Sequence, residues 1–105
     1  DVQKVIDWYV KIIEKGEKGD IVNLGHYYET VVLDYEKALH YYLLAAEQGD
    51  KIGQYNVGIM YEFGKGVDAN ENTAIYWYRK SARKGYEKAQ EKLEEFGVDW
   101  LEENE

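Results

Sequence analysis

The sequence contains no cysteine, no proline and only two histidines, and these absences exclude several kinds of site and segment. Without cysteine, the chain can form no disulfide and offers no thiol nucleophile. Without proline or a serine-rich run, it shows no sign of a linker, and its 105 residues fit a single domain. Its apolar runs are only a few residues long, whereas a membrane-spanning helix needs roughly 20 residues. The sequence therefore predicts one domain without a membrane span.

Negative charge outweighs positive charge, with 21 acidic against 13 basic residues and a net charge of −8. Because phosphates are repelled by such a surface, a nucleic acid is not the expected ligand, and the expected partner is a basic or neutral protein or peptide. The acidic residues concentrate toward the end of the chain, at Glu91, Glu94, Glu95, Asp99, Glu102, Glu103 and Glu105. They form either a solvated outer face or a docking patch for a partner rich in lysine and arginine.

An aromatic pair followed by a glycine occurs three times along the chain. The second ring of each pair precedes its glycine by seven residues, and the pattern returns after 33 and then 36 residues. A period of this length is typical of stacked helical hairpins, which mainly serve as extended binding surfaces. The pairs are Trp8-Tyr9, Tyr41-Tyr42 and Trp77-Tyr78, and the glycines are Gly16, Gly49 and Gly85.

Cap residues and apolar spacing define the expected helices. Asp1, Asp34 and Asn70 hold equivalent places and can accept hydrogen bonds from the first turn of a helix, while the repeated glycines can end one. Because Asp1 already stands at a helix start and is not methionine, the chain resembles a processed protein or a piece of a longer array. The predicted helices span 2–15, 20–30, 34–48, 51–63, 70–84 and 86–96, with a short helical turn at 99–103.

Two glycines lie inside predicted helices. Glycine in a helix interior costs about 1 kcal/mol relative to alanine, so Gly25 and Gly58 predict a partner helix pressed close to the backbone. Glu94 occupies the third equivalent place, where no helix can come equally close. We therefore expect the array to stop after that segment, which would act as a terminal cap.

These motifs resemble the Sel-one-like repeats, a branch of the tetratricopeptide type. The second complete unit carries the family pattern in Val57-Gly58, Tyr61, 64–67, Ala74 and Trp77-Tyr78, and the first carries it in Leu24-Gly25, Tyr28, 34–38 and 45–49. The resemblance implies an all-α, right-handed solenoid of stacked helical hairpins. Its units would be 1–16, the second helix of a partial repeat; 17–49 and 50–85, two repeats; and 86–105, a terminal half-repeat and cap.

The chain departs from the family pattern in two ways. The first complete unit runs 29–33 where the second has its Gly-x-Gly loop and is three residues shorter there, so its turn must differ. Some family members also join each hairpin with paired cysteines, which are absent from this sequence.

The resemblance also implies a concave groove lined by the first helix of each hairpin. The asparagines Asn23 and Asn56 are the best candidates, because an amide can both donate to and accept from a peptide backbone; alternatively each bonds an adjacent helix or stays solvated. Glu29 and Glu62 could receive a basic group, or simply be solvated. The full expected lining is Val22, Asn23, His26, Glu29 and Thr30 with the corresponding Tyr55, Asn56, Ile59, Glu62 and Phe63, of which Tyr55, Ile59 and Phe63 form either an apolar floor or core.

Catalytic and metal sites have little support in the sequence. His26 and Glu29 share one helical face, yet two ligands make a weak metal site, and a histidine on a tyrosine-rich helix is typically structural. The Gly64-Lys65-Gly66 segment lacks the strand and the ending of a phosphate loop and predicts a tight turn. We expect no catalytic residue, no metal and no cofactor.

The function predicted is that of a non-enzymatic interaction module that binds a peptide or protein partner in a concave groove. One alternative is an acidic inhibitor or immunity-type protein that covers a basic site of its partner. A second is a hydrolase of the kind credited to some relatives of the family. The lack of cysteine and of a membrane span favours a soluble cytoplasmic protein without fixing the compartment.

Overall fold

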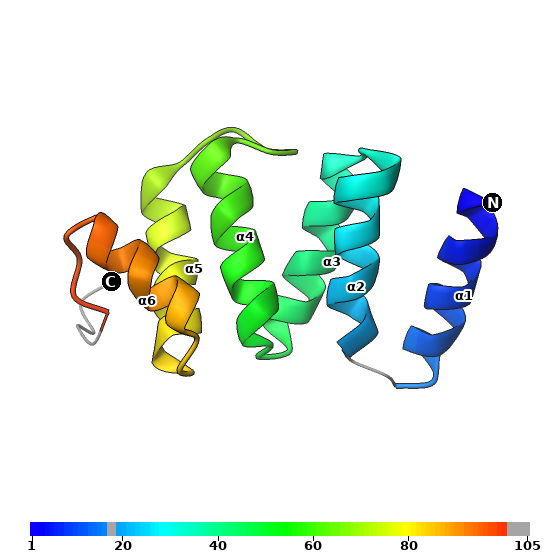
Figure 1. The fold of residues 1–105 in the computed structure, drawn as a ribbon, viewed down its shortest axis with the longest axis horizontal. Helices are drawn as coiled ribbons and strands as arrows, with labels where there is room; N and C mark the ends of the chain where they lie inside the picture. The colour runs from blue at the N-terminus through cyan, green and yellow to red at the C-terminus, as the bar shows by residue number, and fades with distance from the viewer. Residues whose placement is uncertain (17–18, 101–105) are drawn as a thin grey trace.

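The computed structural model describes residues 1–16 and 19–100, and this part of the chain contains helices and no strand. Figure 1 shows these helices arranged side by side, with the two ends of the chain at opposite ends of the stack. The helices are α1 Val2–Glu14, α2 Gly19–Tyr27, the π-helix η1 Tyr28–Val32, α3 Tyr35–Glu47, α4 Lys51–Phe63, α5 Glu71–Arg83 and α6 Glu87–Glu95. The prediction of an all-α stack of helical hairpins is confirmed.

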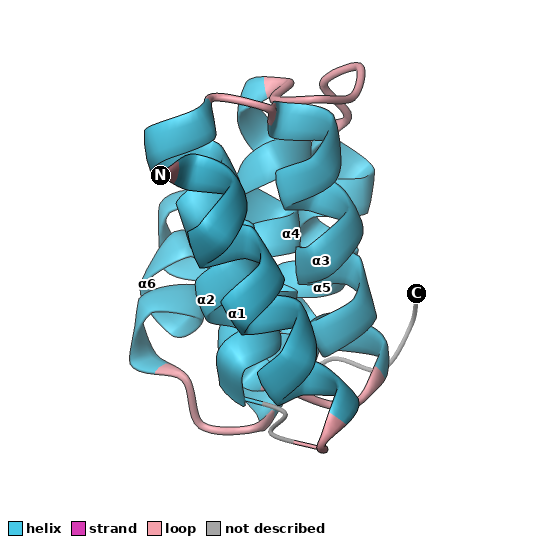
Figure 2. Ribbon diagram, turned by 90° about the vertical axis from the view of Figure 1, so that its right-hand side faces the viewer, coloured by secondary structure: helices cyan, strands magenta, loops and turns pink. Residues whose placement is uncertain are grey.

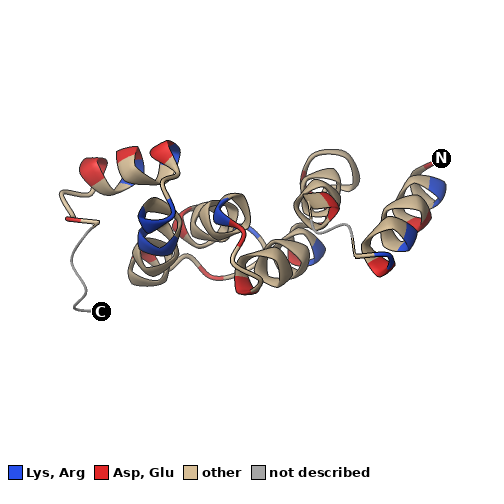
Figure 3. Ribbon diagram, turned by 90° about the horizontal axis from the view of Figure 1, so that it is seen from below, with Lys and Arg blue, Asp and Glu red and all other residues tan. Residues whose placement is uncertain are grey.

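Successive helices zigzag along the long axis, so that α2, α4 and α6 alternate with α1, α3 and α5 (Figure 3). Each helix packs chiefly against the helices before and after it in the sequence. A view along the stack shows them one behind another (Figure 2). The molecule is accordingly elongated, with extents of 43 × 26 × 18 Å.

The predicted caps are present. The side chains of Asp1, Asp34 and Asn70 accept hydrogen bonds from the backbone N–H groups of the first turns of α1, α3 and α5. The glycines after those helices have left-handed backbone conformations, with φ between 89° and 93°. These local signals set where α1, α3 and α5 begin and end.

The core lies between the helices of each hairpin and is closed by two buried tyrosines. Tyr42 and Tyr78 are 1% and 0% exposed. A methyl group added at Gly25 would lie 2.7 Å from the Tyr42 ring, and one added at Gly58 would overlap the Tyr78 ring. The predicted close approach at both glycines is confirmed, and the group that fills the space is the tyrosine ring of the following helix.

The turn of the first hairpin differs from that of the second, as predicted. The predicted helix 20–30 is α-helical only to Tyr27 and continues as η1, which ends at Leu33 with a left-handed φ of 62°. In the second hairpin the equivalent cap of α4 is Gly64, with φ 69°. The π-turn and the left-handed leucine thus replace the Gly-x-Gly loop.

The predicted short helical turn at 99–103 is wrong in its described part, since Asp99 and Trp100 are not helical; 101–103 lie outside the described residues. The chain folds back there: the Val98 N–H donates to the Leu93 carbonyl at 2.9 Å. Phe96, Val98 and Trp100 pack against the core between α5 and α6 and so cover that end of the hairpin stack. Within the described segments, the helices are all too short or too polar to cross a membrane.

Candidate partner-binding surface

The exposed polar side chains predicted on the first hairpin lie on α2 and η1. Asn23, His26 and Thr30 are all exposed, at intervals of three and four residues that keep them on one helical face. The Asn23 amide donates to Asp20 Oδ1 at 3.3 Å, and the Thr30 hydroxyl donates to the His26 carbonyl at 2.8 Å. Both bonds are local and exposed, so this face can exchange them for bonds to a partner.

On the second hairpin, Asn56 occupies the place of Asn23 on α4. Its side chain is half-buried and forms no hydrogen bond with the described residues. The two amides therefore differ: Asn23 is exposed and bonded within its own helix, whereas Asn56 is more enclosed and available.

Glu29 and Glu62 already have partners inside the protein. The Tyr42 hydroxyl donates to Glu29 Oε1 at 2.7 Å and the Tyr78 hydroxyl donates to Glu62 Oε1 at 2.6 Å. Each carboxylate also pairs with a lysine from the following helical unit, Lys65 at 3.1 Å and Lys92 at 3.2 Å. The side chains of Glu29 and Glu62 are 19% and 20% exposed, so most of each is enclosed by these partners.

The surroundings of these hydrogen bonds raise the pKa values of Tyr42 and Tyr78. Burial, together with the hydrogen bond to Glu29 and its charge, raises the pKa of Tyr42 well above its ordinary value of 10.0. Burial and the corresponding contact with Glu62 do the same to the pKa of Tyr78. Both phenols therefore stay protonated as donors throughout the neutral range.

The apolar members of the predicted lining divide between core and surface. Tyr55 and Ile59 are half-buried against the cluster between α4, α5 and α6, with the Tyr55 ring 5.2 Å from that of Tyr86. Burial is the main reason why the pKa of Tyr55 is raised. Val22 packs against the core cluster that joins α2, α3 and α4 and includes Leu24, Tyr42 and Val57. Phe63, by contrast, is 59% exposed, with Lys92 Nζ 5.2 Å from its ring centroid.

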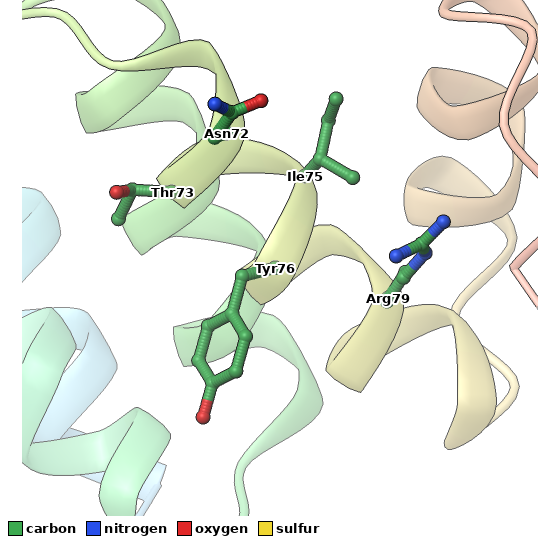
Figure 4. A pocket seen from close by; sticks show the side chains of 5 residues that line it. All are labelled: Asn72, Thr73, Ile75, Tyr76 and Arg79. Atoms are coloured by element: carbon green, nitrogen blue, oxygen red, sulfur yellow. The ribbon is translucent and has the colours of Figure 1, made fainter. Parts of the chain in front are cut away.

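Two hollows lie on other surfaces, and neither includes a residue of the predicted lining. One of about 420 Å³ lies along α5, and Figure 4 shows its five side chains, with Tyr76 pointing away from Ile75. The second, of about 510 Å³, lies where the end of α3, the start of α4 and α5 meet. They are lined by Asn72, Thr73, Ile75, Tyr76 and Arg79, and by Ala46, Glu47, Gly49, Gln54, Tyr76, Trp77 and Lys80.

The groups that catalysis or metal binding would need are dispersed or already bonded. Within 1–16 and 19–100, no three side chains of His, Cys, Asp or Glu gather into a possible metal site. The single serine of the sequence, Ser81, is 0% exposed and donates to the Lys51 carbonyl at 2.7 Å. That hydroxyl therefore joins α5 to the start of α4.

Of the described residues of the acidic end, Glu91, Glu94 and Glu95 lie on α6, and Asp99 lies after that helix. Glu87, Glu91 and Glu94 are exposed at helical spacing and so share one face. Glu102, Glu103 and Glu105 of the predicted acidic patch lie outside the described residues.

Sequence reasoning missed the tyrosine and lysine partners of the two glutamates. Glu29 and Glu62 recur in the repeat, and so do Tyr42 and Tyr78, which is a signal that could have paired them. The two separations of 13 and 16 residues differ by the three-residue deletion in the first turn. The lysines carry no such signal, because Lys65 lies in a loop and Lys92 lies on α6.

Comparison with known proteins agrees with this architecture. The family model described as Sel1 repeat matches residues 21–50 and 51–86. A crystal structure of a protective antigen from uropathogenic Escherichia coli strains, displaying an SLR fold, superposes with a TM-score of 0.81 at 33% identity over 99% of this chain and 23% of that one.

Two curated relatives are longer proteins with regulatory or binding names. DAP3-binding cell death enhancer 1 of Rattus norvegicus is 48% identical over 61 residues, which are 58% of this chain and 12% of that protein. Chitin synthase regulatory factor 3 of Schizosaccharomyces pombe is 34% identical over 98 residues, 89% of this chain and 10% of that protein. The chain therefore spans only a small part of the length of either relative.

Proposed function

The chain belongs to the Sel1 repeat family, and on that premise we propose that it is a non-enzymatic interaction module that binds a peptide or protein segment across the face formed by α2 and α4. Helical repeats use stacked hairpins as extended binding surfaces. The names of the two relatives, one a binding protein and one a regulatory factor, support the same class of function. The proposal assigns this chain no catalytic role.

The observation that carries the proposal is the repeated amide at Asn23 and Asn56. An amide side chain donates and accepts, so it can pair with the backbone of an extended peptide whatever its sequence. The Asn23 amide has only an exposed bond of 3.3 Å to exchange, and the Asn56 amide is bonded to none of the described residues. His26 and Ile59 stand one turn further along each helix and would contact the same segment.

The bonds of Glu29 and Glu62 would hold this face in shape. Each ties the first helix of a hairpin to the second through tyrosine and to the next helical unit through lysine. A preorganised surface loses less conformational entropy on binding. The partly exposed, negatively charged side chains of Glu29 and Glu62 would favour a basic or neutral partner segment.

The test is affinity capture with quantitative mass spectrometry, comparing the parent chain with an Asn23→Ala/Asn56→Ala variant. We expect loss of specific partners and unchanged helicity by circular dichroism. Asn72→Ala is the matched control, since Asn72 is an exposed asparagine on α5. Equal capture by parent and double variant would move the binding site to another surface.

A second candidate is an acidic inhibitor, which the exposed Glu87, Glu91 and Glu94 face of α6 favours. Binding through that face would weaken steeply with added salt, because exposed charges are screened over about 10 Å at 0.1 M ionic strength. Replacing the three glutamates by glutamine would then abolish capture, while the Asn23→Ala/Asn56→Ala variant would bind normally. Normal capture by the glutamine variant together with loss of capture by Asn23→Ala/Asn56→Ala supports binding across the face formed by α2 and α4.

A further inference from the structure

The larger of the two hollows described above lies where the end of α3, the start of α4 and α5 meet, and we call it the α3–α5 hollow. It has a volume of about 510 Å³, and its walls include Glu47, Gln54, Tyr76, Trp77 and Lys80. The hollow lies within the stack, since α1 and α2 precede these three helices and α6 follows them (Figure 1). It is therefore bounded by neighbouring helices of the stack and is not the open face of an end helix.

A buried hydrogen-bond acceptor lies in the wall of this hollow. Gln54 is only 4% exposed, and its Nε2 donates to the Ala46 carbonyl at 3.3 Å. This bond fixes the orientation of the amide, because only its nitrogen can donate to a carbonyl. The remaining atom, Gln54 Oε1, is buried and has no hydrogen-bond partner among the described residues. Since a buried acceptor without a donor is destabilising, an N–H group from a ligand would be stabilised there.

The repeat shows that the stack does not require this acceptor. Ile21 holds the place of Gln54 in the first repeat and is 3% exposed, so an apolar side chain is accommodated there. Gln90 holds the same place after the second repeat, and its Nε2 donates to the Ala82 carbonyl at 3.0 Å. The bond made by Nε2 is thus a recurring structural contact. It gives no role to the oxygen of Gln54.

Two aromatic rings and two ammonium groups surround the opening. The rings of Tyr76 and Trp77 meet edge to face with centroids 5.3 Å apart, and Tyr76 is 42% exposed. Lys80 is half-buried, with its Nζ 5.1 Å from the centroid of the Tyr76 ring. A methyl group added at Gly49, which also lines the hollow, would lie 3.1 Å from Lys84 Nζ. The hollow therefore has an aromatic wall with positive charge at its rim.

The acidic groups near the hollow are less firmly placed or already bonded. Glu47 lines the hollow but is exposed, and within the described part of the chain it forms no ion pair. An exposed charge without a fixed contact is screened by water and contributes little. Asp50, at the start of α4, accepts hydrogen bonds from the first turn of that helix. The best-positioned charge of the lining is therefore the Lys80 ammonium, which lies over the Tyr76 ring.

We propose that the α3–α5 hollow is a second peptide-binding site, for a partner segment with an acidic residue beside an apolar one. Gln54 Oε1 accepts a backbone N–H, because a neutral donor loses less hydration than an ammonium group in a buried site. The carboxylate of the segment pairs with Lys80 and Lys84 at the rim. Its apolar side chain lies against the rings of Tyr76 and Trp77.

This site and the face formed by α2 and α4 are distinct. Gln54 and Asn56 are two residues apart on α4, so their side chains leave that helix about 200° apart. The charge preferences also differ, since Glu29 and Glu62 on the other face favour a basic or neutral segment. The proposal therefore stands independently of the proposed function, and the Asn23→Ala/Asn56→Ala variant should bind at the α3–α5 hollow like the parent chain.

The test is an NMR titration of the isotope-labelled chain with two sets of short peptides that are acetylated and amidated at their ends. In the acidic set, aspartate or glutamate stands beside a leucine, valine or phenylalanine, and in the basic set lysine replaces the acid. We expect the acidic set to shift the Trp77 indole and Gln54 side-chain amide signals with a Kd of about 1 mM or lower. No shift with the acidic set, or equal shifts with both sets, would overturn the proposal. An equal response to sodium acetate would also overturn it, because it would reduce the site to nonspecific anion contact.

Variants matched to the repeat identify the groups responsible. Gln54→Ile places the residue of the first repeat there and should weaken binding of the acidic set about tenfold, as expected for one lost hydrogen bond. Lys80→Glu should abolish the preference for the acidic set, whereas Lys4→Glu, the same change at an exposed lysine of α1, should bind like the parent. Glu47→Lys should bind the acidic set at least as tightly as the parent.

Circular dichroism establishes that each variant is folded. Should Gln54→Ile fail to fold, the pair Lys80→Glu and Lys4→Glu still decides the matter. An unchanged preference for the acidic set in Lys80→Glu would overturn the assignment of the carboxylate to Lys80. Unchanged affinity in a folded Gln54→Ile variant would overturn the role of the buried acceptor.

Discussion

The hydroxyl of Tyr78 donates a hydrogen bond of 2.6 Å to Glu62, and this bond joins the two helices of the second hairpin. Tyr42 and Glu29 repeat the relationship at 2.7 Å in the first hairpin. The same tyrosine rings fill the space above the helix glycines. Close packing and a charge-assisted hydrogen bond therefore depend on one side chain, which makes the tyrosine the best place to probe how the hairpin is held together.

Replacing Tyr78 by phenylalanine removes the hydroxyl and keeps the ring. We expect the free energy of unfolding to fall by about 2 kcal/mol, because hydrogen bonds to charged groups contribute about 1.5–3 kcal/mol and Glu62 loses a donor. Urea denaturation followed by circular dichroism gives the value. Tyr76→Phe is the control: Tyr76 is 42% exposed, and its loss of a hydroxyl should change stability by less than about 0.5 kcal/mol. Equal effects at the two positions would refute the assigned role of the bond.

Alanine in place of Gly58 tests the close approach of the tyrosine ring. Alanine raises helix propensity by about 1 kcal/mol, but here its methyl group overlaps the Tyr78 ring, and forced overpacking costs about 1–3 kcal/mol. We expect a net loss of stability of about 1 kcal/mol in urea denaturation. Gly19→Ala provides the contrast, because among the described residues no atom beyond its chain neighbours and its own helix backbone lies within 4 Å of the added methyl group. That variant should be as stable as the parent or more so.

The sequence was sufficient for features that depend on local chemistry and repetition. Asp34 and Asn70 as helix caps, and Gly58 as a point of close approach, follow from single-residue preferences placed on a repeat of known type. The recurrence of both residue types in the repeat could have paired Tyr78 with Glu62, but single-residue preferences could not show their bond, because it depends on how two helices cross. Periodicity also could not separate groove from core for Tyr55 and Ile59, since α4 contacts helices on both sides and so has more than one apolar face.

The sequence predicts that the turn of the first hairpin differs from that of the second, but it does not predict a π-turn. A deletion of three residues requires another path, but its form depends on how η1 meets α3. The assignment of Asn23 and Asn56 to partner binding stays a prediction. Both asparagines lie on the helices expected to line the groove, and only a binding measurement can test their role.

Leu33 offers a test of the alternative turn. A left-handed leucine is strained by roughly 1–2 kcal/mol, and its side chain is 64% exposed, so truncation loses little packing. We expect Leu33→Gly to raise the free energy of unfolding by about 1 kcal/mol, as measured by thermal and urea denaturation. Leu33→Ala is the matched control, because it shortens the side chain and keeps the strained backbone. A gain in the alanine variant as large as that in the glycine variant would show that the side chain, and not φ, is responsible.

High pH should destabilise the fold through its buried tyrosines. The pKa values of Tyr42 and Tyr78 are raised in the folded protein above the ordinary 10.0, so above pH 10 the unfolded chain loses phenol protons that the folded chain retains. Proton loss confined to the unfolded state favours unfolding. The tyrosine contribution is therefore fully present below pH 10 and declines as pH rises, by up to about 1.4 kcal/mol per pH unit for each phenol.

The comparison that isolates this effect is between the parent chain and a Tyr42→Phe/Tyr78→Phe variant, each unfolded in urea at intervals from pH 8 to pH 11.5. Lysine deprotonation is common to both proteins, so the difference between their slopes above pH 10 reports the two phenols. We expect the variant to be less stable at pH 8 and to show the shallower decline, so that the two curves converge. Parallel curves would mean that Tyr42 and Tyr78 ionise in the folded state as readily as in the unfolded state, and that the buried bonds to Glu29 and Glu62 do not hold their protons.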